Sequence, residues 1–307
     1  MIVPLPGRIR LSQAMEVVPW TLTLVFLNLF FYFLLFAPPS GVPTDTGGFS
    51  SDFIESAGRY YLEWQDQPQY GRQAVELQAL GAQSVRDGDF LKSLETWSST
   101  SDPVGFRIWK TKLHDIFQEE ARKPIHLFGL SQSQSSVFRW ITYQFSHQGP
   151  IHLLSNVLFL IFFAACVEKM VGGAMMGLIY MMGGFVGGYA FLWMDHSGFI
   201  PMVGASASVT ALMGFMVTAT RKRLIPFFYF FVPIRHYMGR ILLSPYWILP
   251  LFLVEDLTRI LADPPGWGGG VAHSAHLGGA FAGMLLGLAH RWGQRRSELL
   301  GGGEPSS

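Results

Sequence analysis

Four polar side chains stand in strongly apolar parts of the sequence and could together carry out acyl transfer. They are Ser206, His276, His152 and Asn156. A serine hydroxyl becomes a nucleophile when a neutral histidine within about 3 Å accepts its proton, and no third residue is required for that step. Ser206 is therefore the candidate nucleophile, and His276 is the candidate base.

Attack of a serine on a carbonyl group creates an oxyanion, which needs hydrogen-bond donors that are already in place. His152 and Asn156 are four residues apart, so they share one face of a helix. These two side chains and the backbone N–H groups at the helix start near Ser206 are the candidate donors, and the dipole of that helix adds positive potential. No carboxylate lies at this level in the three segments that carry these residues, so we expect a Ser/His dyad.

Six apolar runs must position these residues. Half of the 307 residues are hydrophobic and 14% are charged, whereas an ordinary soluble domain has about a quarter charged residues. The runs approach the roughly 20 residues that a helix needs to cross a bilayer. They lie at about 17–37, 151–168, 174–194, 204–220, 241–262 and 271–290. We expect an all-α, polytopic membrane protein with six transmembrane helices.

The charge argues against a nucleic-acid-binding protein, and the cysteine content excludes a fold held by an internal disulfide. The formal net charge of +1 argues against a nucleic-acid partner, because a polyanion-binding surface would carry an excess of Lys and Arg. The single cysteine, Cys166, allows no internal disulfide.

The placement of Lys and Arg predicts the orientation in the membrane. The basic residues of the tails and short connections fall on one side if the six runs alternate in direction. They are Arg8, Arg10, Lys169, Arg221, Lys222, Arg223, Arg235, Arg240, Arg291, Arg295 and Arg296. Both termini are therefore predicted to be cytoplasmic. The first run has no signal-peptide cleavage pattern, so we interpret it as a retained anchor.

In this topology the second, fourth and sixth runs all start at the outer side, which brings the four polar residues to a similar depth. Intramembrane polar groups usually face a bundle interior or a wet cavity. The fourth run offers only about 15 residues from Ser206, or roughly 22 Å of helix against a hydrocarbon core of roughly 30 Å. We expect it to start below the outer surface, after non-helical backbone.

Small residues favour a close approach between the fourth and sixth runs. Gly279 and Gly283 form a G-x-x-x-G face, and Ala207, Ala211 and Gly214 offer small partners. His276 lies three residues before Gly279 on the same side, so this approach would bring Ser206 and His276 within hydrogen-bonding reach.

About a hundred residues, 39–146, separate the first two runs. Their apolar spacing in "FIESAGRYYLEW", "QAVELQAL" and "VGFRIWKTKLHDIF" is typical of amphipathic helices. We expect a small helical extracytoplasmic insert.

These residues resemble the rhomboid intramembrane serine proteases over nearly all of the six-run core. "HQGPIHLLSN" matches the family pattern H-x-x-x-x-H-x-x-x-N, "GASA" matches G-x-S-x, and "AHLGGAFAG" matches A-H-x-x-G-x-x-x-G. "FRW" around Arg139 is similar to a Trp-Arg element of the first outer loop, and Glu168 resembles an acidic residue that closes the second helix.

The resemblance implies a role for each matching residue. Ser206 would be the nucleophile, His276 the base, and His152 and Asn156 the oxyanion hole together with the Ser206 backbone. His147 would be a structural residue of the loop. The chemistry requires no cofactor and no metal.

The resemblance also implies a substrate class. Rhomboid proteases cleave transmembrane segments that contain small, helix-destabilising residues, so the expected partners are other membrane proteins and the lipid bilayer. The fifth helix and the loop after it would gate substrate entry.

The apolar runs and the basic residues predict the domain limits. We expect a cytoplasmic tail at 1–16, a first transmembrane helix at 17–38, the outer loop with its insert at 39–146, a six-helix rhomboid-like core completed by 147–292, and a cytoplasmic tail at 293–307. The absence of disulfides and sequons favours a bacterial inner membrane.

Three positions depart from the family pattern. Ala207 follows the nucleophile where glycine is common, Phe138 replaces a tryptophan, and Thr210 stands where some members have an aromatic ring packed on the catalytic histidine.

Two other functions stay open. One is a catalytically silent relative that binds membrane helices, although such proteins usually lack the serine or the histidine. The other is a metal or proton transporter that uses histidines at the membrane level, but neither inverted repeats nor H-E-x-x-H are visible. Those histidines are His147, His152, His273 and His276.

Overall fold

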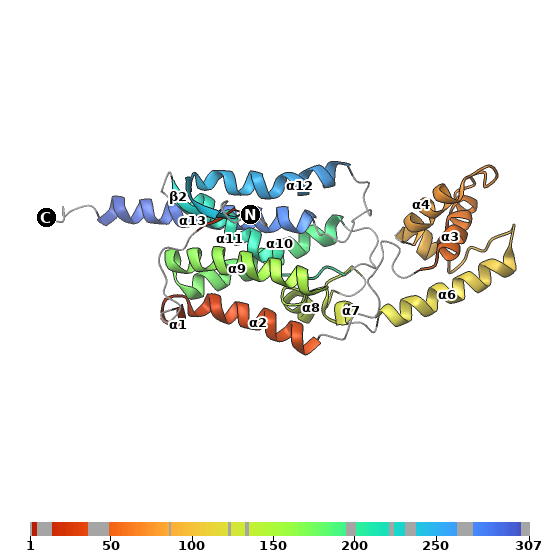
Figure 1. The fold of residues 1–307 in the computed structure, drawn as a ribbon, viewed down its shortest axis with the longest axis horizontal. Helices are drawn as coiled ribbons and strands as arrows, with labels where there is room; N and C mark the ends of the chain where they lie inside the picture. The colour runs from red at the N-terminus through yellow and green to blue at the C-terminus, as the bar shows by residue number, and fades with distance from the viewer. Residues whose placement is uncertain are drawn as a thin grey trace.

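Helices make up most of the chain in the structure, which is a computed structural model (Figure 1). It describes residues 2–4, 14–35, 49–85, 87–121, 124–132, 135–194, 201–220, 224–230, 238–262 and 273–301. The helices are α1 (Ala14–Val17), α2 (Pro19–Leu35), α3 (Ser51–Trp64), α4 (Ala74–Ser84), α5 (Gly88–Ser93), α6 (Pro103–Ala121), α7 (Pro124–Phe128), α8 (Val137–Thr142), α9 (Pro150–Val171), α10 (Gly173–Met194), α11 (Ser206–Ala219), α12 (Ile248–Ala262) and α13 (His273–Gly301), with a 3₁₀ turn η2 (Pro245–Trp247).

The helix α11 forms the centre of a bundle. Every residue from Ala207 to Val217 is buried, and the main core cluster joins α11 to residues of α9, α10, α12 and α13. The bundle helices α2, α9, α10, α12 and α13 lie side by side with their long axes in a similar direction (Figure 1). A helix that is apolar all round and buried all round is the expected centre of a membrane bundle.

The contact between α11 and α13 is made by small residues. A Cβ atom added to Gly279 would overlap the carbonyl oxygen of Ala207, and one added to Gly283 would overlap that of Ala211. A Cβ atom on Gly214 would in turn overlap the carbonyl oxygen of Ala280. The two backbones therefore touch, as the G-x-x-x-G pattern predicts.

A small sheet interrupts the predicted all-helical chain. The strands β1 (Ile2–Pro4), β2 (Ile225–Phe230) and β3 (Met238–Leu243) pair antiparallel in the order β1-β2-β3. The apolar run predicted to begin at 241 is therefore a strand at its start, and the helix α12 begins only at Ile248, after Pro245. An apolar run alone does not separate a short strand from a helix end.

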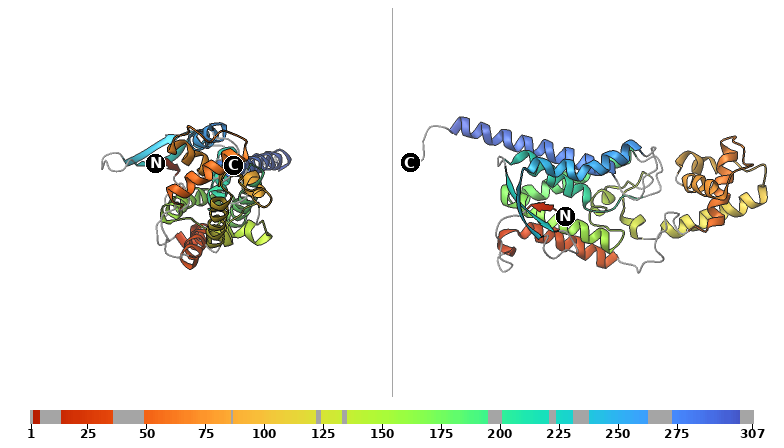
Figure 2. Two further views of the ribbon diagram at one scale, coloured as in Figure 1. Left: turned by 90° about the vertical axis from the view of Figure 1, so that its right-hand side faces the viewer. Right: turned by 45° about the horizontal axis from the view of Figure 1, so that its top comes forward.

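The helices α3 to α6 form a unit with its own core, which we call the α3–α6 unit. It extends beyond one end of the bundle, and the sheet lies at the other end (Figures 1 and 2). Its buried residues are largely aromatic rings and leucines contributed by α3, α5 and α6. The three sequence stretches with helical spacing all coincide with helices, namely α3, α4 and α6.

The loop after α7 and the helix α8 pack against the bundle. Leu130 forms an antiparallel bridge with Met202, and Leu130 and Tyr143 share a buried cluster with Ala207 and Ala275. This segment therefore reaches the starts of α11 and α13.

Within the described part of the chain, two helices, α9 and α10, are long and apolar enough to cross a membrane by length and composition, and α2 and α11 are apolar but shorter. Large apolar side chains on the outer surface of the bundle are exposed. They include Phe26, Phe33, Ile151, Leu154, Leu178, Trp193, Val254, Leu261, Phe281 and Leu288. Exposed apolar surface of this extent is typical of protein that faces lipid.

Candidate active site

The start of α11 presents Ser206 as the first residue of the helix. The preceding segment is not helical, as predicted, and Gly204 has a φ of +119°, a backbone conformation that glycine adopts without a steric penalty. The N–H of Gly204 donates to the carbonyl oxygen of Tyr143 at 2.8 Å. The turn that leads into Ser206 is thus fixed to the segment after α8.

Gly204 also lies directly against the two predicted oxyanion donors. A Cβ atom on Gly204 would lie 2.8 Å from Nε2 of His152 and 3.4 Å from Nδ2 of Asn156. Asn156 is buried, and its amide donates to the carbonyl oxygen of His152 at 3.0 Å. That bond uses one of the two amide protons. The structure therefore brings His152, Asn156 and the start of α11 together.

His276 reaches the same region from α13. The hydroxyl of Thr210, one turn beyond Ser206, lies 3.1 Å from the carbonyl oxygen of His276, and Ala207 contacts Gly279. Among the described residues, no hydrogen bond joins the Ser206 hydroxyl to the His276 ring, which bonds to another partner.

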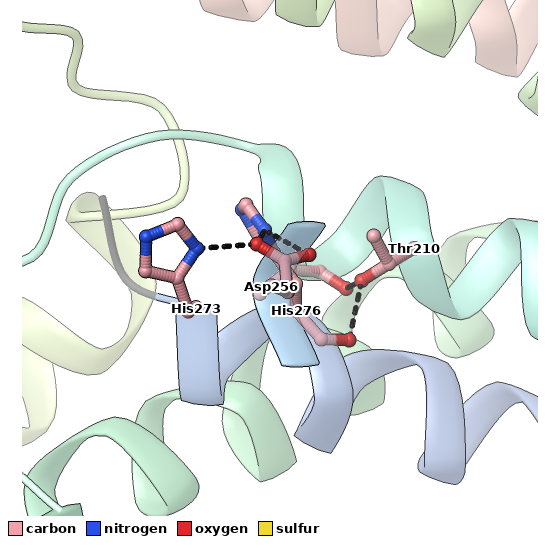
Figure 3. A network of polar contacts seen from close by, with 5 residues as sticks. Thr210, Asp256, His273 and His276 are labelled. Carbon is pink, nitrogen blue, oxygen red and sulfur yellow. Dashed lines mark hydrogen bonds and ion pairs between the residues drawn. The ribbon is translucent and has the colours of Figure 1, made fainter. Parts of the chain in front are cut away.

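That partner is Asp256 on α12, which the sequence analysis missed. Nδ1 of His276 lies 3.0 Å from both carboxylate oxygens of Asp256, and Nδ1 of His273 lies 2.5 Å from Oδ1. Figure 3 shows both imidazole rings directed at the Asp256 carboxylate and Thr210 beside the main chain of His276. Asp256 is only 5% exposed.

A signal for Asp256 was present in the sequence. Asp256 lies in the fifth apolar run, "ILPLFLVEDLTRILA", whereas the predicted dyad depends on the segments of α9, α11 and α13. An ionisable residue inside an apolar run is by default a candidate for a functional site. Asp256 lies toward the end of α12 and His276 lies near the start of α13, so consecutive antiparallel helices place them at one level.

The same three side chains could hold a metal ion. One ligand atom each from Asp256, His273 and His276 lies within 4.8 Å of the others, and two imidazoles with one carboxylate form a common zinc ligand set. However, the three ligand atoms already satisfy one another as hydrogen-bond donors and acceptors. The network is therefore complete without an ion.

The remaining predicted residues have structural contacts. Nδ1 of His147 lies 3.2 Å from the carbonyl oxygen of Phe145, and its ring centroid is 5.2 Å from that of His152. Arg139 donates to the carbonyl oxygens of His126 and Gly129, the latter at 3.1 Å. It thereby fixes the loop between α7 and α8.

Glu168, near the end of α9, binds the start of α2. Its carboxylate accepts hydrogen bonds from the N–H of Trp20 at 3.0 Å, the N–H of Thr21 at 2.8 Å and the Thr21 hydroxyl at 2.6 Å. A carboxylate at a helix N-terminus satisfies unpaired N–H groups and favours the helix dipole. Glu168 therefore joins α9 to α2.

Comparison with known proteins identifies a family. The family model of the Rhomboid domain matches residues 134–292, which is more than half of the chain. Rhomboid-related protein 2 of Mus musculus is 28% identical over 190 residues, which cover 60% of this chain and 58% of the relative. RHOMBOID-like protein 4 of Arabidopsis thaliana is 29% identical over 151 residues, which cover 49% of this chain and 33% of the relative.

A third relative matches a shorter segment. RHOMBOID-like protein 1 of Arabidopsis thaliana is 35% identical over 82 residues, which cover 27% of this chain and 21% of the relative. The matches thus span less than two thirds of each relative's own length. The family match contains α9 to α12, most of α13 and every residue of the candidate site. The chain belongs to the rhomboid family of integral membrane proteins.

Proposed function

We propose that this protein is an intramembrane serine endopeptidase that cleaves transmembrane segments of other membrane proteins. The observation that carries the proposal is the meeting of three helix starts. His152 and Asn156 come from the first two turns of α9, Ser206 from the first turn of α11 and His276 from the first turn of α13, and the contacts of Gly204 and Thr210 join these turns.

In the proposed reaction His276 accepts the hydroxyl proton of Ser206 at Nε2 while Oγ attacks the scissile carbonyl carbon. The resulting oxyanion accepts hydrogen bonds from His152, from Asn156 and from the Ser206 N–H, which is free because it belongs to the first turn of α11. His276 then gives its proton to the leaving amine, and the peptide bond breaks. Water attacks the acyl-enzyme by the same route in reverse and releases the second product.

We propose the membrane arrangement that the six apolar runs predict. The helices α2, α9, α10, α11, α12 and α13 would each cross the bilayer, and the outward apolar side chains of the bundle would face lipid. The domain limits would be those predicted above, at 1–16, 17–38, 39–146, 147–292 and 293–307. The α3–α6 unit would then be the extracytoplasmic insert, at the active-site end of the bundle.

The orientation proposal depends on basic residues that lie mostly outside the described part of the chain, including Arg8, Arg10 and residues 221–223. With both termini cytoplasmic, the site opens toward the outer side, and water reaches Ser206 from there. A bacterial inner membrane is the proposed location. No cofactor takes part in the proposed reaction.

A second candidate function is a non-catalytic rhomboid protein that binds membrane helices. The observation that favours it is that no hydrogen bond joins the Ser206 hydroxyl to the His276 ring among the described residues. Catalytic hydrogen bonds often shorten only when substrate binds, so an activity measurement separates the two functions.

The test is labelling of the full-length protein in detergent micelles with a fluorophosphonate probe, which reacts with activated serines, followed by peptide mapping. We expect an adduct on Ser206. We expect Ser206→Ala to abolish it and His276→Ala to slow it by at least about 10³-fold, because the hydroxyl then lacks its base.

Ser208→Ala is the matched control. The Ser208 hydroxyl is buried and donates to Oε1 of Gln144 at 2.9 Å, so it faces away from the site and its loss should leave the Ser206 adduct in place. Undiminished labelling of a folded Ser206→Ala or His276→Ala protein would refute the dyad. A folded wild-type protein that takes up no probe would favour the helix-binding function.

A further inference from the structure

The proposed base must present a specific tautomer. His276 accepts the Ser206 proton at Nε2 only if its other ring nitrogen, Nδ1, carries the hydrogen. The hydroxyl of Thr210, on the neighbouring turn of α11, lies 2.8 Å from the carbonyl oxygen of Ala207 and 3.1 Å from that of His276, so it contacts main-chain oxygens and not the His276 ring. The ring therefore needs another group to fix its orientation.

We propose that Asp256 of α12 is a positioning residue that turns the Ser206–His276 pair into a Ser–His–Asp triad. The inference rests on the proposed protease function. Both oxygens of the Asp256 carboxylate lie 3.0 Å from Nδ1 of His276, and an ionised carboxylate can only accept hydrogen bonds. The contact therefore holds the proton on Nδ1 and leaves the Nε2 lone pair free.

The burial of Asp256 strengthens this contact. A carboxylate that is 5% exposed has lost most of its water, and it is stable in the bundle only if the protein supplies donors in exchange. The two described side chains that supply them are His276 and His273, one turn apart on α13. A hydrogen bond in such a low-dielectric site is stronger than the same bond in water.

His273 has a different part in this network. Its Nδ1 bonds only to Oδ1, at 2.5 Å, and limits the rotation of the carboxylate about its own axis. On the far side of the residue, the Thr210 hydroxyl contacts the His276 carbonyl oxygen. His276 is thus held at its ring by α12 and at its main chain by α11.

The proton transfers during attack by Ser206 involve only Ser206, His276 and the leaving amine. When Ser206 attacks, its proton moves to Nε2, and His276 becomes a cation that keeps the hydrogen on Nδ1. Asp256 remains ionised and pairs with this cation, and no proton passes to it. His276 then returns to the neutral form by giving the Nε2 proton to the leaving amine. The carboxylate therefore favours the charged state that exists only after the attack has begun, which lowers the barrier.

The test compares the rate of fluorophosphonate labelling of Ser206 in the full-length wild-type protein and in Asp256→Asn. Asparagine fills the same space but can donate its N–H to Nδ1, which selects the wrong tautomer. We expect the maximal labelling rate to fall by about 10² to 10⁴-fold, since the corresponding change in a soluble Ser–His–Asp protease lowers kcat by about 10⁴. The probe concentration at half-maximal rate should change by less than about three-fold, because ground-state binding is untouched.

Two matched variants separate this effect from a general loss of structure. Asp115→Asn makes the same chemical change at an exposed position of α6 and should label at the wild-type rate. Asp256→Glu keeps the carboxylate and should label faster than Asp256→Asn. A residue that only stabilises the fold would not give this order among variants of equal thermal stability.

A spectroscopic readout needs no folded Asp256 variant. Each imidazole N–H that bonds to the carboxylate should give a low-field proton resonance in the wild-type protein. One should vanish in His276→Ala and the other in His273→Ala. If no such resonance belongs to His276, the triad is wrong.

The outcomes distinguish the inference from the proposed function. If Ser206→Ala and His276→Ala abolish labelling but a folded Asp256→Asn labels within about three-fold of wild type, the dyad stands and Asp256 has no positioning role. If the folded wild-type protein is not labelled at all, the protease function fails and the triad fails with it.

Discussion

The α3–α6 unit and the α11–α13 contact pack helices in opposite ways. In the α3–α6 unit large rings fill the space between helices, as where Phe53 stacks on Trp109 with ring centroids 5.5 Å apart and Tyr60 meets Phe106 edge-on at 5.1 Å. Between α11 and α13 the contacting atoms are the backbones themselves, with Gly279 and Gly283 against Ala207 and Ala211.

The difference agrees with the proposed surroundings of each region. In water, removing large apolar side chains from solvent drives helices together, and each aromatic ring buries a large area. Among lipid tails this driving force is absent, so association depends on close van der Waals contact and hydrogen bonds, which small residues permit. The two packing modes are therefore consistent with a unit in water joined to a bundle in lipid.

A carboxylate fixes neighbouring residues in the α3–α6 unit and another does so in the bundle, at different degrees of exposure. Glu63, at the end of α3, accepts five hydrogen bonds from the loop Ser99–Ser101 that leads into α6, between 2.6 and 3.0 Å in length. Asp256 is more deeply buried and bonds to two histidines of α13. Glu63 orders a backbone segment, whereas Asp256 orients side chains.

The largest effect should come from a side chain added to the backbone contact. A Cβ atom on Gly283 would overlap the main-chain oxygen, carbon and Cα of Ala211, none of which can rotate away. We expect Gly283→Val to destabilise the bundle by about 3 kcal/mol, at the upper end of overpacking effects. Thermal unfolding in detergent, followed by the loss of helical circular dichroism, measures it.

Gly293→Val on the same helix is the control. A Cβ atom at Gly293 meets nothing within 4 Å, so the change alters helix propensity without a clash and should leave the unfolding temperature of the bundle near that of wild type. Equal unfolding temperatures for the two variants would mean that α13 does not need backbone contact with α11. Hydrogen exchange of α3 and α6 should be the same in both variants.

The second largest effect should be a loss of stability of the α3–α6 unit when Glu63 is protonated. Burial raises the pKa of its carboxyl, but hydrogen bonds from Ser99, Ser101 and Thr100 outweigh burial and lower the pKa to about 2 from an ordinary 4.5. A lowered folded-state pKa contributes stability above pH 4.5 and loses it as the pH falls toward 2. We expect the protection of α3 and α6 amides against hydrogen exchange, corrected for intrinsic rates, to fall over this window.

Glu63→Gln should remove most of that dependence, because glutamine does not titrate. At pH 7 we expect it to lower the stability of the unit by about 1–2 kcal/mol, since one acceptor oxygen is replaced by an amide that faces donors. Glu76→Gln on α4 is the control, because Glu76 is exposed and forms only a 3.8 Å pair with Arg72. If wild type and Glu63→Gln lose protection in parallel between pH 5 and 2.5, another carboxylate is responsible.

The sequence predicted the helices well, because long apolar runs bounded by polar residues have few alternatives. The start of α11 at Ser206 and the touching faces of Gly279 and Gly283 followed from hydrophobicity and residue size. The sheet did not follow, because the pairing of β1 with β2 joins Ile2 to Tyr229 across more than two hundred residues. No local pattern records such a partner.

The candidate site could be predicted in part for a similar reason. The roles of Ser206, His276, His152 and Asn156 came from short motifs within single helices, so a linear pattern contains them. Asp256 has no such motif around it, and its importance depends on the rotation of α12 about its axis. Only the packed bundle determines which residue of α12 points toward α13.

The smallest predicted effect tests whether the packing of α11 against α13 changes the reactivity of Ser206. Thr210 and Thr218 lie two turns apart on α11, and their hydroxyls lie 3.1 Å from the carbonyl oxygens of His276 and Met284 on α13. Thr210→Val and Thr218→Val each remove one such contact at nearly constant volume. Both should lower stability by about 0.5–1 kcal/mol, the usual worth of one hydrogen bond between membrane helices.

The two variants should nevertheless differ in reactivity. Thr210→Val frees the main chain of His276 and should slow fluorophosphonate labelling of Ser206 by about two- to ten-fold, because a small displacement of a catalytic group is costly. Thr218→Val, two turns away, should label at the wild-type rate in spite of an equal loss of stability. Equal labelling of both variants would mean that Asp256 and His273 hold the ring of His276 without help from α11, whereas equal slowing would trace the effect to the helix contact as a whole.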